Sequence, residues 1–126
     1  MANEVLLEDT DLLVSQTDEK GIVLYANDTF CEIAEYEVEE LIGKPHNIVR
    51  HSDMPRVAFE DLWKTIKAGN TWEGFVKNST KSGNYYWVFA TVFPYKDGYM
   101  SIRKMATKKE INKYTKLYQK LKREKG

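Results

Sequence analysis

The chain has 126 residues, 42% of them hydrophobic, and its formal net charge is zero, so we expect one domain with a modest core and no overall charge that favours nucleic acid. A single cysteine, Cys31, excludes an internal disulfide and any zinc site built from several cysteines. No stretch approaches the roughly 18 apolar residues of a membrane span, so we expect a cytoplasmic protein that reaches a membrane only through a partner or a missing segment.

The first third of the chain predicts a β-hairpin followed by two short helices. Residues 12–16 and 22–26 are β-prone, and the sequence Asp-Glu-Lys-Gly between them is typical of a turn. Asn27 or the aspartate after it is a suitable N-cap for a short helix that runs to Ala34. The sequence EVEELIG predicts one or two further helical turns, which end at Gly43 because glycine is a common helix stop.

A segment with an unusual concentration of polar side chains follows. The sequence PHNIVRHSDMP, residues 45–55, holds both histidines of the chain, His46 and His51, with Arg50 and Asp53 beside them. It has no apolar run long enough for a buried helix, so we expect an irregular loop held at its ends by the prolines. A loop of this kind between short helices and a sheet is a natural wall for a small-molecule pocket.

The second half predicts a helix, three strands and a last helix. Residues 55–69 have the apolar period of an amphipathic helix. Residues 72–78, 85–95 and 98–105 are typical of antiparallel strands joined at Ser-Gly and Asp-Gly turns. The last helix begins near Lys108, and its narrow apolar stripe consists of Ile111, Tyr114, Tyr118 and Leu121. We expect this stripe to pack on the sheet or on its counterpart in a homodimer, together with residues 5–7.

The order of these elements predicts an α+β fold. The two hairpins pair into a five-stranded antiparallel sheet, with short helices on one face and a C-terminal helix. Charge is distributed unevenly along the chain: residues 1–42 contain twelve acidic side chains against Lys20 alone, whereas nine basic residues lie from Lys104 onward. Such a basic tail is more often the solvated face of a helix than a nucleic-acid footprint, and here it also complements the acidic first third.

No pattern in the sequence is typical of an enzyme. His46 and His51, with Asp53 nearby, are a conceivable metal site, but they lack helical i, i+4 spacing and a cysteine partner. No serine has the Gly-flanked setting of a nucleophile elbow, and the sequence contains neither GxGxxG nor GxxxxGK[ST]. We therefore expect no catalytic residue and no metal site.

A pocket for an aromatic cofactor is an interpretation that the residues leave open. Asparagine amides can donate to and accept from a ring edge; the candidates are Asn27, Asn47 and Asn78. Arg50 has a planar guanidinium that suits a phosphate or a ring carbonyl. Aromatic side chains of the sheet can stack on a ring; the candidates are Trp72, Tyr85, Tyr86 and Trp87. Each of these residues also has an ordinary structural role open to it, so spacing alone favours a pocket and a plain core equally.

Four segments resemble the PAS domains of bacterial aerotaxis receptors, and the similarity extends over about residues 11–105. They are G-x-P-H-N-x-V-R-H-x-D-M-P (43–55), W-x-G-x-x-K-N (72–78), G-x-x-Y-W-V (83–88) and GYMSIR (98–103). The resemblance implies a PAS fold with a non-covalent FAD between sheet and helices. It also implies a redox or oxygen sensor for energy taxis, which relays the redox state of the flavin to a chemotaxis or other signalling output.

The resemblance also assigns roles to residues. It implies that Arg50, His51 and Asp53 bind the flavin, that Trp72 and Asn78 line the flavin ring with Tyr86 or Trp87, and that Asn27 matches the family's asparagine at the start of the first helix. Haem-binding PAS domains use an axial histidine, for which His46 or His51 would serve. Cys31 lies in the first helix and not in the NCRF-like segment of light-sensing PAS domains, so we expect no photochemical adduct.

We accordingly divide the chain into an N-terminal cap segment (1–10), a PAS sensor domain (11–106) and an amphipathic exit helix (107–126). The expected partners are FAD, a second copy of the chain, and a downstream signalling domain or chemotaxis-receptor-like protein. Aerotaxis receptors continue into membrane and signalling segments, so we expect either an excised sensor domain or a stand-alone PAS protein. The alternative is a cofactor-free or haem-binding PAS module for dimerisation and interaction.

Overall fold

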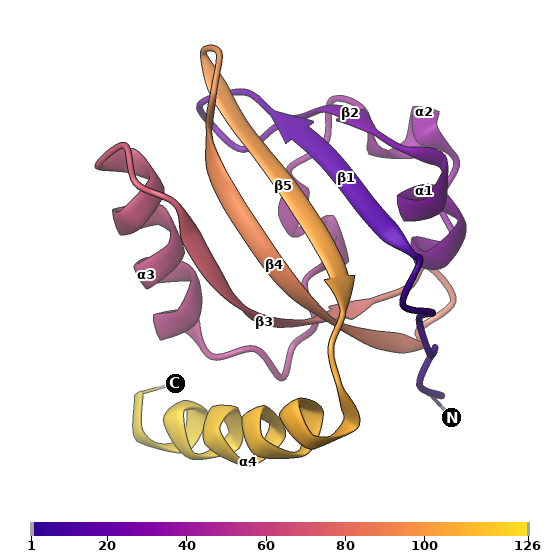
Figure 1. The fold of residues 1–126 in the computed structure, drawn as a ribbon, viewed down its shortest axis with the longest axis vertical. Coiled ribbons are helices and arrows are strands. Elements are labelled where there is room, and N and C mark those ends of the chain that lie inside the picture. Colours follow the sequence, from indigo (N-terminus) through magenta and orange to yellow (C-terminus); the bar gives the residue numbers. More distant parts are fainter. Residues whose placement is uncertain (1, 126) are drawn as a thin grey trace.

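A computed structural model of the chain describes residues 2–125 and contains a five-stranded antiparallel sheet with helices on both faces (Figure 1). The strands are β1 (Leu12–Thr17), β2 (Val23–Ala26), β3 (Trp72–Ser79), β4 (Tyr85–Tyr95) and β5 (Gly98–Met105). Their order in the sheet is β2-β1-β5-β4-β3. The N-terminal hairpin thus joins the three C-terminal strands through the β1–β5 pair, and the predicted α+β fold class is confirmed.

The helices between β2 and β3 cover what we call the inner face of the sheet (Figure 1). They are α1 (Asp28–Ala34), α2 (Val38–Leu41), the 3-10 turn η1 (His46–Val49) and α3 (Arg56–Lys67). The segment predicted to be wholly irregular therefore contains one 3-10 turn. The last helix, α4 (Lys108–Lys125), follows β5 and lies against the opposite, outer face. Within residues 2–125 no helix is both long and apolar enough to span a bilayer.

Asn27 fixes the start of α1 to the neighbouring strand β1. Its side-chain oxygen accepts from the backbone N–H of Phe30, which caps the helix, and from the N–H of Val14, both at 3.0 Å. Its amide nitrogen donates to the carbonyl of Leu12 at 2.8 Å. One side chain therefore satisfies a free donor of the helix end and two backbone groups of a strand.

Side chains of β4 alternate between the two faces, as they do in any strand. Tyr86, Val88, Ala90 and Val92 are buried on the inner face, where they form the centre of the core. Trp87 is buried on the outer face and stacks on Tyr118 of α4, with ring centroids 6.0 Å apart. The strand is covered on both sides, which explains its nearly continuous apolar sequence.

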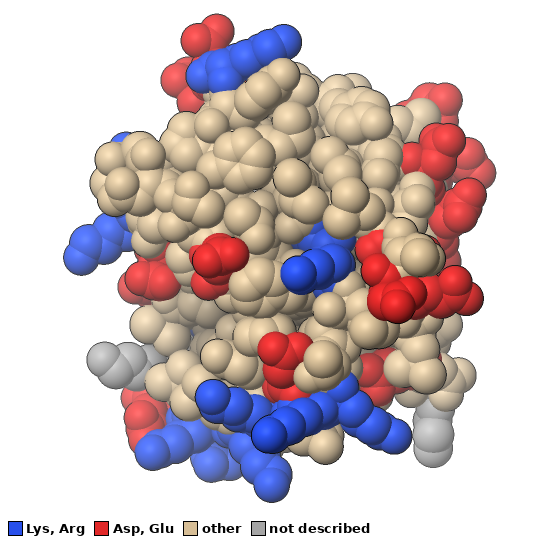
Figure 2. Space-filling model, in the orientation of Figure 1, with Lys and Arg blue, Asp and Glu red and all other residues tan. Residues whose placement is uncertain are grey.

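The apolar stripe of α4 packs on the sheet, which is the first of the two arrangements that we expected. The Tyr114 ring lies 4.4 Å from that of Phe75, and both belong to an aromatic cluster on the outer face. Of residues 5–7, Leu7 is buried and Leu6 is 79% exposed. Figure 2 shows lysine and arginine side chains along α4 and acidic side chains on the flank formed by α1 and α2, so the charge separation in the sequence is also a separation in space.

Candidate functional site

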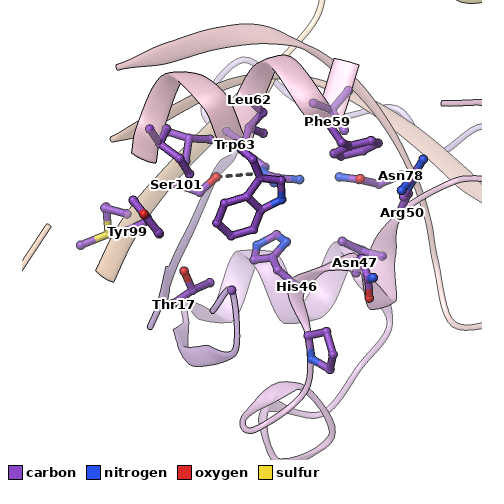
Figure 3. Close-up of a pocket in the computed structure, with 18 of the residues that line it drawn as sticks. Thr17, His46, Asn47, Arg50, Phe59, Leu62, Trp63, Asn78, Tyr99 and Ser101 are labelled. Carbon is purple, nitrogen blue, oxygen red and sulfur yellow. Dashed lines mark hydrogen bonds between the residues drawn. The ribbon is translucent and has the colours of Figure 1, made fainter. Parts of the chain in front are cut away.

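A cavity of about 160 Å³ lies between the inner face of the sheet and the segment from η1 to α3 (Figure 3). Helix α3 and strands β3 and β4 provide its apolar wall: Phe59, Leu62, Trp63, Ile66, Val76 and Val92. Polar side chains gather on the other sides: Thr17, His46, Asn47, Arg50, Asn78, Ser101 and Arg103. An apolar wall with a few convergent polar groups is typical of a small-molecule site.

The floor of the cavity holds a buried guanidinium. Arg103 is only 6% exposed, and its Nε donates to Ser101 Oγ at 2.9 Å. When the Asn78 amide is oriented to satisfy its neighbours, its oxygen accepts from Arg103 Nη1 at 3.0 Å and its nitrogen donates to Val49 O at 3.2 Å. Among residues 2–125 no carboxylate forms an ion pair with Arg103. Burial lowers the pKa of this guanidinium, because a charge taken out of water without a partner is costly.

Tyr86 adds a buried hydroxyl without a hydrogen-bond partner beside the floor. Its side chain is completely buried opposite Asn78, the residue with which it pairs across β3 and β4. The hydroxyl lies close to the Asn78 amide but makes no hydrogen bond of good geometry to any described residue. Burial raises the pKa of Tyr86 to about 12, so this group is a neutral donor at ordinary pH. Buried polar groups without a hydrogen-bond partner are rare in folded proteins, and this hydroxyl lies beside a cavity.

His46 contributes a neutral imidazole to the cavity. Its Nε2 lies 2.9 Å from Ser15 Oγ, and its ring packs edge-on against Phe30 at 5.7 Å. Burial, and secondly the positive charge of Arg103, lower the pKa of His46 to about 3. The imidazole is therefore an uncharged hydrogen-bonding group at neutral pH.

The mouth of the cavity is formed by Arg50, Trp63 and the β1–β2 turn. The Arg50 guanidinium lies 4.2 Å over the ring of Phe59, and the residue is exposed. Trp63 reaches from α3 toward the turn and meets Tyr99 edge-on at 5.7 Å. A Cβ added at Gly21 of the turn would lie 3.1 Å from the indole of Trp63, so a glycine at this position leaves room for the tryptophan.

The structure brings some of the predicted binding residues to the cavity and places others elsewhere. Its lining includes His46, Asn47, Arg50 and Asn78. Outside the lining, Asn27 caps α1 and Trp87 packs under α4, as described above. Trp72 donates from its indole nitrogen to Asp61 Oδ2 at 2.8 Å, which ties β3 to α3. Tyr86 lies beside the floor without lining the cavity, and the role of all these residues in binding stays a prediction.

His51 and Asp53 lie on the outer side of β3, away from the cavity. The side chain of Asp53 accepts from Lys77 Nζ at 2.7 Å. The ring of His51 packs edge-on against Tyr85 at 6.1 Å. Neither residue belongs to the cavity lining, so a part for them in binding, as the resemblance implies, would be indirect in this arrangement.

Sequence reasoning did not identify Arg103, the most unusual residue of the site. In the sheet Arg103 pairs with Leu13 on one side and Ala90 on the other, and both are buried. Strand alternation alone assigns Arg103 to the buried face of β5, where charged residues are rare. This was the signal in the sequence that could have identified it. Trp63 is one of the apolar residues that give residues 55–69 their helical period, and nothing in the sequence distinguishes it from the others.

The sequence profile of the PAS fold family matches residues 23–107. The chain belongs to the PAS fold family. This PAS domain is 47% identical over 124 residues to the aerotaxis receptor of Escherichia coli (strain K12), covering 94% of the chain and 24% of the receptor. The resemblance to PAS domains of aerotaxis receptors is thereby confirmed.

Other relatives of this PAS domain are also regulatory proteins. It is 26% identical over 89 residues to the nitrogen fixation regulatory protein of Klebsiella oxytoca, covering 71% of the chain and 18% of that protein. A solved light-oxygen-voltage domain studied with a flavin analogue has a TM-score of 0.71 at 16% identity, covering 86% of each chain, and this likeness concerns the fold alone. The chain thus spans about a quarter or less of these curated relatives, which are sensory and regulatory proteins.

Proposed function

We propose that this PAS domain binds FAD in the cavity and relays the redox state of the flavin to a chemotaxis or other signalling output. The observation that carries the proposal is Arg103, a buried guanidinium that faces the cavity without a carboxylate partner among residues 2–125. A ligand with an electron-rich or anionic edge would supply the missing partner. The 47% identity to an aerotaxis receptor supports a sensor of this kind.

The residues of the cavity suit the chemistry of a flavin ring. Arg103, Asn78 and His46 present hydrogen-bonding groups that match the polar edge of the ring, and the apolar wall matches its hydrocarbon edge. Arg50 and Lys20 at the mouth are the cations available to a pyrophosphate. Bound FAD would supply reversible electron transfer, and the side chains of the chain would bind the ring, orient it and exclude water.

Asn78 is the residue through which a change at the floor would reach the rest of the fold. Its amide joins Arg103 of β5 to the carbonyl of Val49 at the end of η1. A change of charge next to Arg103 would alter the hydrogen bond between Arg103 and the Asn78 amide. The hydrogen bond from the same amide to Val49 of η1 would then change as well. The amide therefore gives the redox signal a route from the floor to the wall of the cavity.

We also propose a homodimer and a downstream signalling partner, in the cytoplasm. Part of the outer face is left uncovered by α4, and Figure 2 shows few charges over it. Large apolar side chains are exposed on β1 and β2, with Leu12 at 46% and Tyr25 at 48%. Apolar surface of this kind on a folded domain supports an interaction site.

A cofactor-free interaction module is the alternative, and one observation favours it. The cavity of about 160 Å³ is smaller than the roughly 300–1,000 Å³ of ordinary ligand sites. A flavin would fit only after side chains at the mouth, such as Trp63 and Arg50, move outward. Without such movement the cavity remains a small packing defect, and the function lies on the surface.

The absorption spectrum of the purified protein distinguishes these proposals. Flavin bands, with FAD identified by chromatography after heat release, are the expected result. Arg103→Met should lose most of the bound FAD, because the buried cation that the ligand would pair with is gone. A haem spectrum would move the site to His46. The absence of any chromophore after incubation with FAD would contradict the sensor proposal and favour the interaction module.

A further inference from the structure

The segment after η1 is fastened to the edge strand β3. Arg50 and Asn78 form an isolated antiparallel bridge, and both line the cavity. One residue further, the N–H of His51 donates to the carbonyl of Lys77 at 3.3 Å. Successive strand residues point to opposite faces, so Asn78 faces the cavity while Lys77 faces the outer side. Residues 50 and 51 thus pair with the edge of β3 at a point where one face of the strand borders the cavity and the other face lies on the outer side.

A compact polar cluster holds this segment from the outer side. Lys77 Nζ donates to Asp53 Oδ2 at 2.7 Å, and the backbone N–H of Asp53 donates to His51 Nδ1 at 2.9 Å. The ammonium of Lys77 lies 4.5 Å from the centre of the Tyr85 ring, on which the ring of His51 also packs edge-on. The Lys77 side chain is 14% exposed and that of Asp53 is 58% exposed. The cation is therefore held in place by its surroundings, and the carboxylate closes the cluster from the solvent side.

The backbone of Lys77 is bound to the same segment. Its N–H points at the Sδ of Met54 at 3.2 Å, and the N–H of Met54 donates to His51 O at 3.1 Å. Met54 is almost completely buried. Residues 51–54 thus form a tight turn that is fixed to Lys77 through its backbone and its side chain, whereas Arg50 enters the cavity lining directly before the turn.

We propose that His51, Asp53 and Lys77 are positioning residues, here called the outer clamp, which fix the turn 51–54 on β3 so that Arg50 and Asn78 face the cavity together. The inference rests on the proposed FAD site and deepens it. In this arrangement the outer clamp acts on the ligand only through Arg50 and Asn78. Lys77, which belongs to the 72–78 segment of the resemblance but was assigned no role, then matters as much for binding as Asp53 does.

FAD binding by the full chain tests the outer clamp. Asp53→Asn and Lys77→Met should each weaken FAD binding by about tenfold, the lower end of what loss of a supporting partner costs a metal site. Lys77→Arg keeps a cation at this position and should bind nearly as well as the unchanged chain. Lys81→Met is the matched control, because it removes the Lys81–Glu40 ion pair of 2.5 Å, which lies outside the cavity lining, and should leave binding unchanged.

A charge exchange distinguishes a positioning role from direct contact. The double variant Asp53→Lys with Lys77→Glu rebuilds the ion pair in reverse and should recover part of the lost affinity, because the contact of the ammonium with the Tyr85 ring is not rebuilt. If Asp53→Asn weakens binding while Lys77→Met does not, and the exchange recovers nothing, Asp53 contacts the ligand itself and the proposal is wrong. Unchanged binding in both single variants would overturn it equally.

Amide hydrogen exchange gives a readout that needs no ligand. In the protein without FAD, Asp53→Asn and Lys77→Met should accelerate exchange at the N–H groups of His51 and Met54 and leave the centre of β4 protected. If these amides exchange at the unchanged rate in both variants, the outer clamp does not exist. If they exchange faster in a protein that never binds FAD, the clamp stands and the proposed function fails.

Discussion

The hydroxyl of Tyr118 in α4 donates a hydrogen bond of 2.7 Å to the backbone carbonyl of Phe75 in β3. The two residues are 43 positions apart in the sequence, and both are buried. Burial raises the pKa of Tyr118, so the hydroxyl keeps its proton at any physiological pH. The bond fastens the last helix to the outer face of the sheet at one defined point.

Removal of that hydroxyl tests how firmly α4 is held. Tyr118→Phe should lower the free energy of unfolding by about 1–2 kcal/mol, because the carbonyl of Phe75 is left buried without its partner. Urea denaturation followed by circular dichroism measures the change. Tyr114→Phe, one turn earlier on the same helix, is the control and should cost less than about 0.5 kcal/mol. Equal losses of unfolding free energy in the two variants would show that the hydrogen bond from Tyr118 to Phe75 does not contribute measurably to stability.

Acid should destabilise the protein through His46. Its pKa is lowered to about 3 in the folded state, so between about pH 6.5 and 4.5 the unfolded chain takes up a proton that the folded chain does not. Stability present above pH 6.5 is lost as the pH falls, by up to about 2–3 kcal/mol over this window. Carboxylates with lowered pKa values contribute mainly at lower pH.

The variant His46→Gln isolates this effect. It should be less stable at pH 7.5, where the bond to Ser15 is disturbed, but its stability should depend less on pH between 6.5 and 4.5. Any remaining slope is expected from His51, whose pKa is also lowered, chiefly by burial and then by Lys77. A slope unchanged from that of the original chain would contradict the assignment to His46.

Asn27 should behave as a structural residue of α1 and β1. Asn27→Ala removes the helix cap and two bonds to strand β1, and we expect a loss of about 2 kcal/mol. Asn27→Asp keeps the acceptor for Phe30 and Val14 and should recover about half of this. Thermal unfolding measures both. A variant that lost FAD while its apoprotein kept full stability would instead place Asn27 in contact with the ligand.

Gly21→Ala tests the packing of Trp63 at the mouth of the cavity. The backbone at Gly21 has φ +83°, and an added Cβ would lie 3.1 Å from the indole. We expect a loss of about 1–2 kcal/mol, since alanine is strained in this conformation. Combination with Trp63→Phe separates the two causes: the smaller ring relieves the contact but not the strain. Additive losses in the double variant would show that the contact contributes nothing.

Arg103→Met separates stability from binding. Replacement of Arg103 by an apolar side chain of similar length removes a buried charge without a counter-ion but leaves the acceptors of Ser101 and Asn78 without a donor. The two effects oppose each other, so the stability of the apoprotein should change by less than about 1 kcal/mol. The same change should abolish most FAD binding. Chemical denaturation of the flavin-free protein provides the measurement, with Arg56→Met on the exposed start of α3 as the control. A large loss of stability would show that Arg103 has a structural role in the core.

The elements could be predicted because their signals are local. Apolar periods, Gly turns and an asparagine cap mark each helix and strand within a few residues, and the observed bounds agree with them closely. The site depended on relations that are not local. The prediction that residues 45–55 form one wall of the cavity agrees with its lining. The orientation of His51 and Asp53, however, follows from the bridge between Arg50 and Asn78, and no periodicity in the sequence predicts that bridge.

The separation of charge between α4 and the flank of α1 and α2 (Figure 2) makes this molecule strongly dipolar although its formal net charge is zero. At low ionic strength such a molecule adsorbs to both anion and cation exchangers, each through a different pole. Salt weakens both kinds of adsorption, because a Debye length of about 10 Å at 0.1 M is shorter than the distance between the poles of a domain this size. Column behaviour and isoelectric point are therefore expected to disagree for this protein.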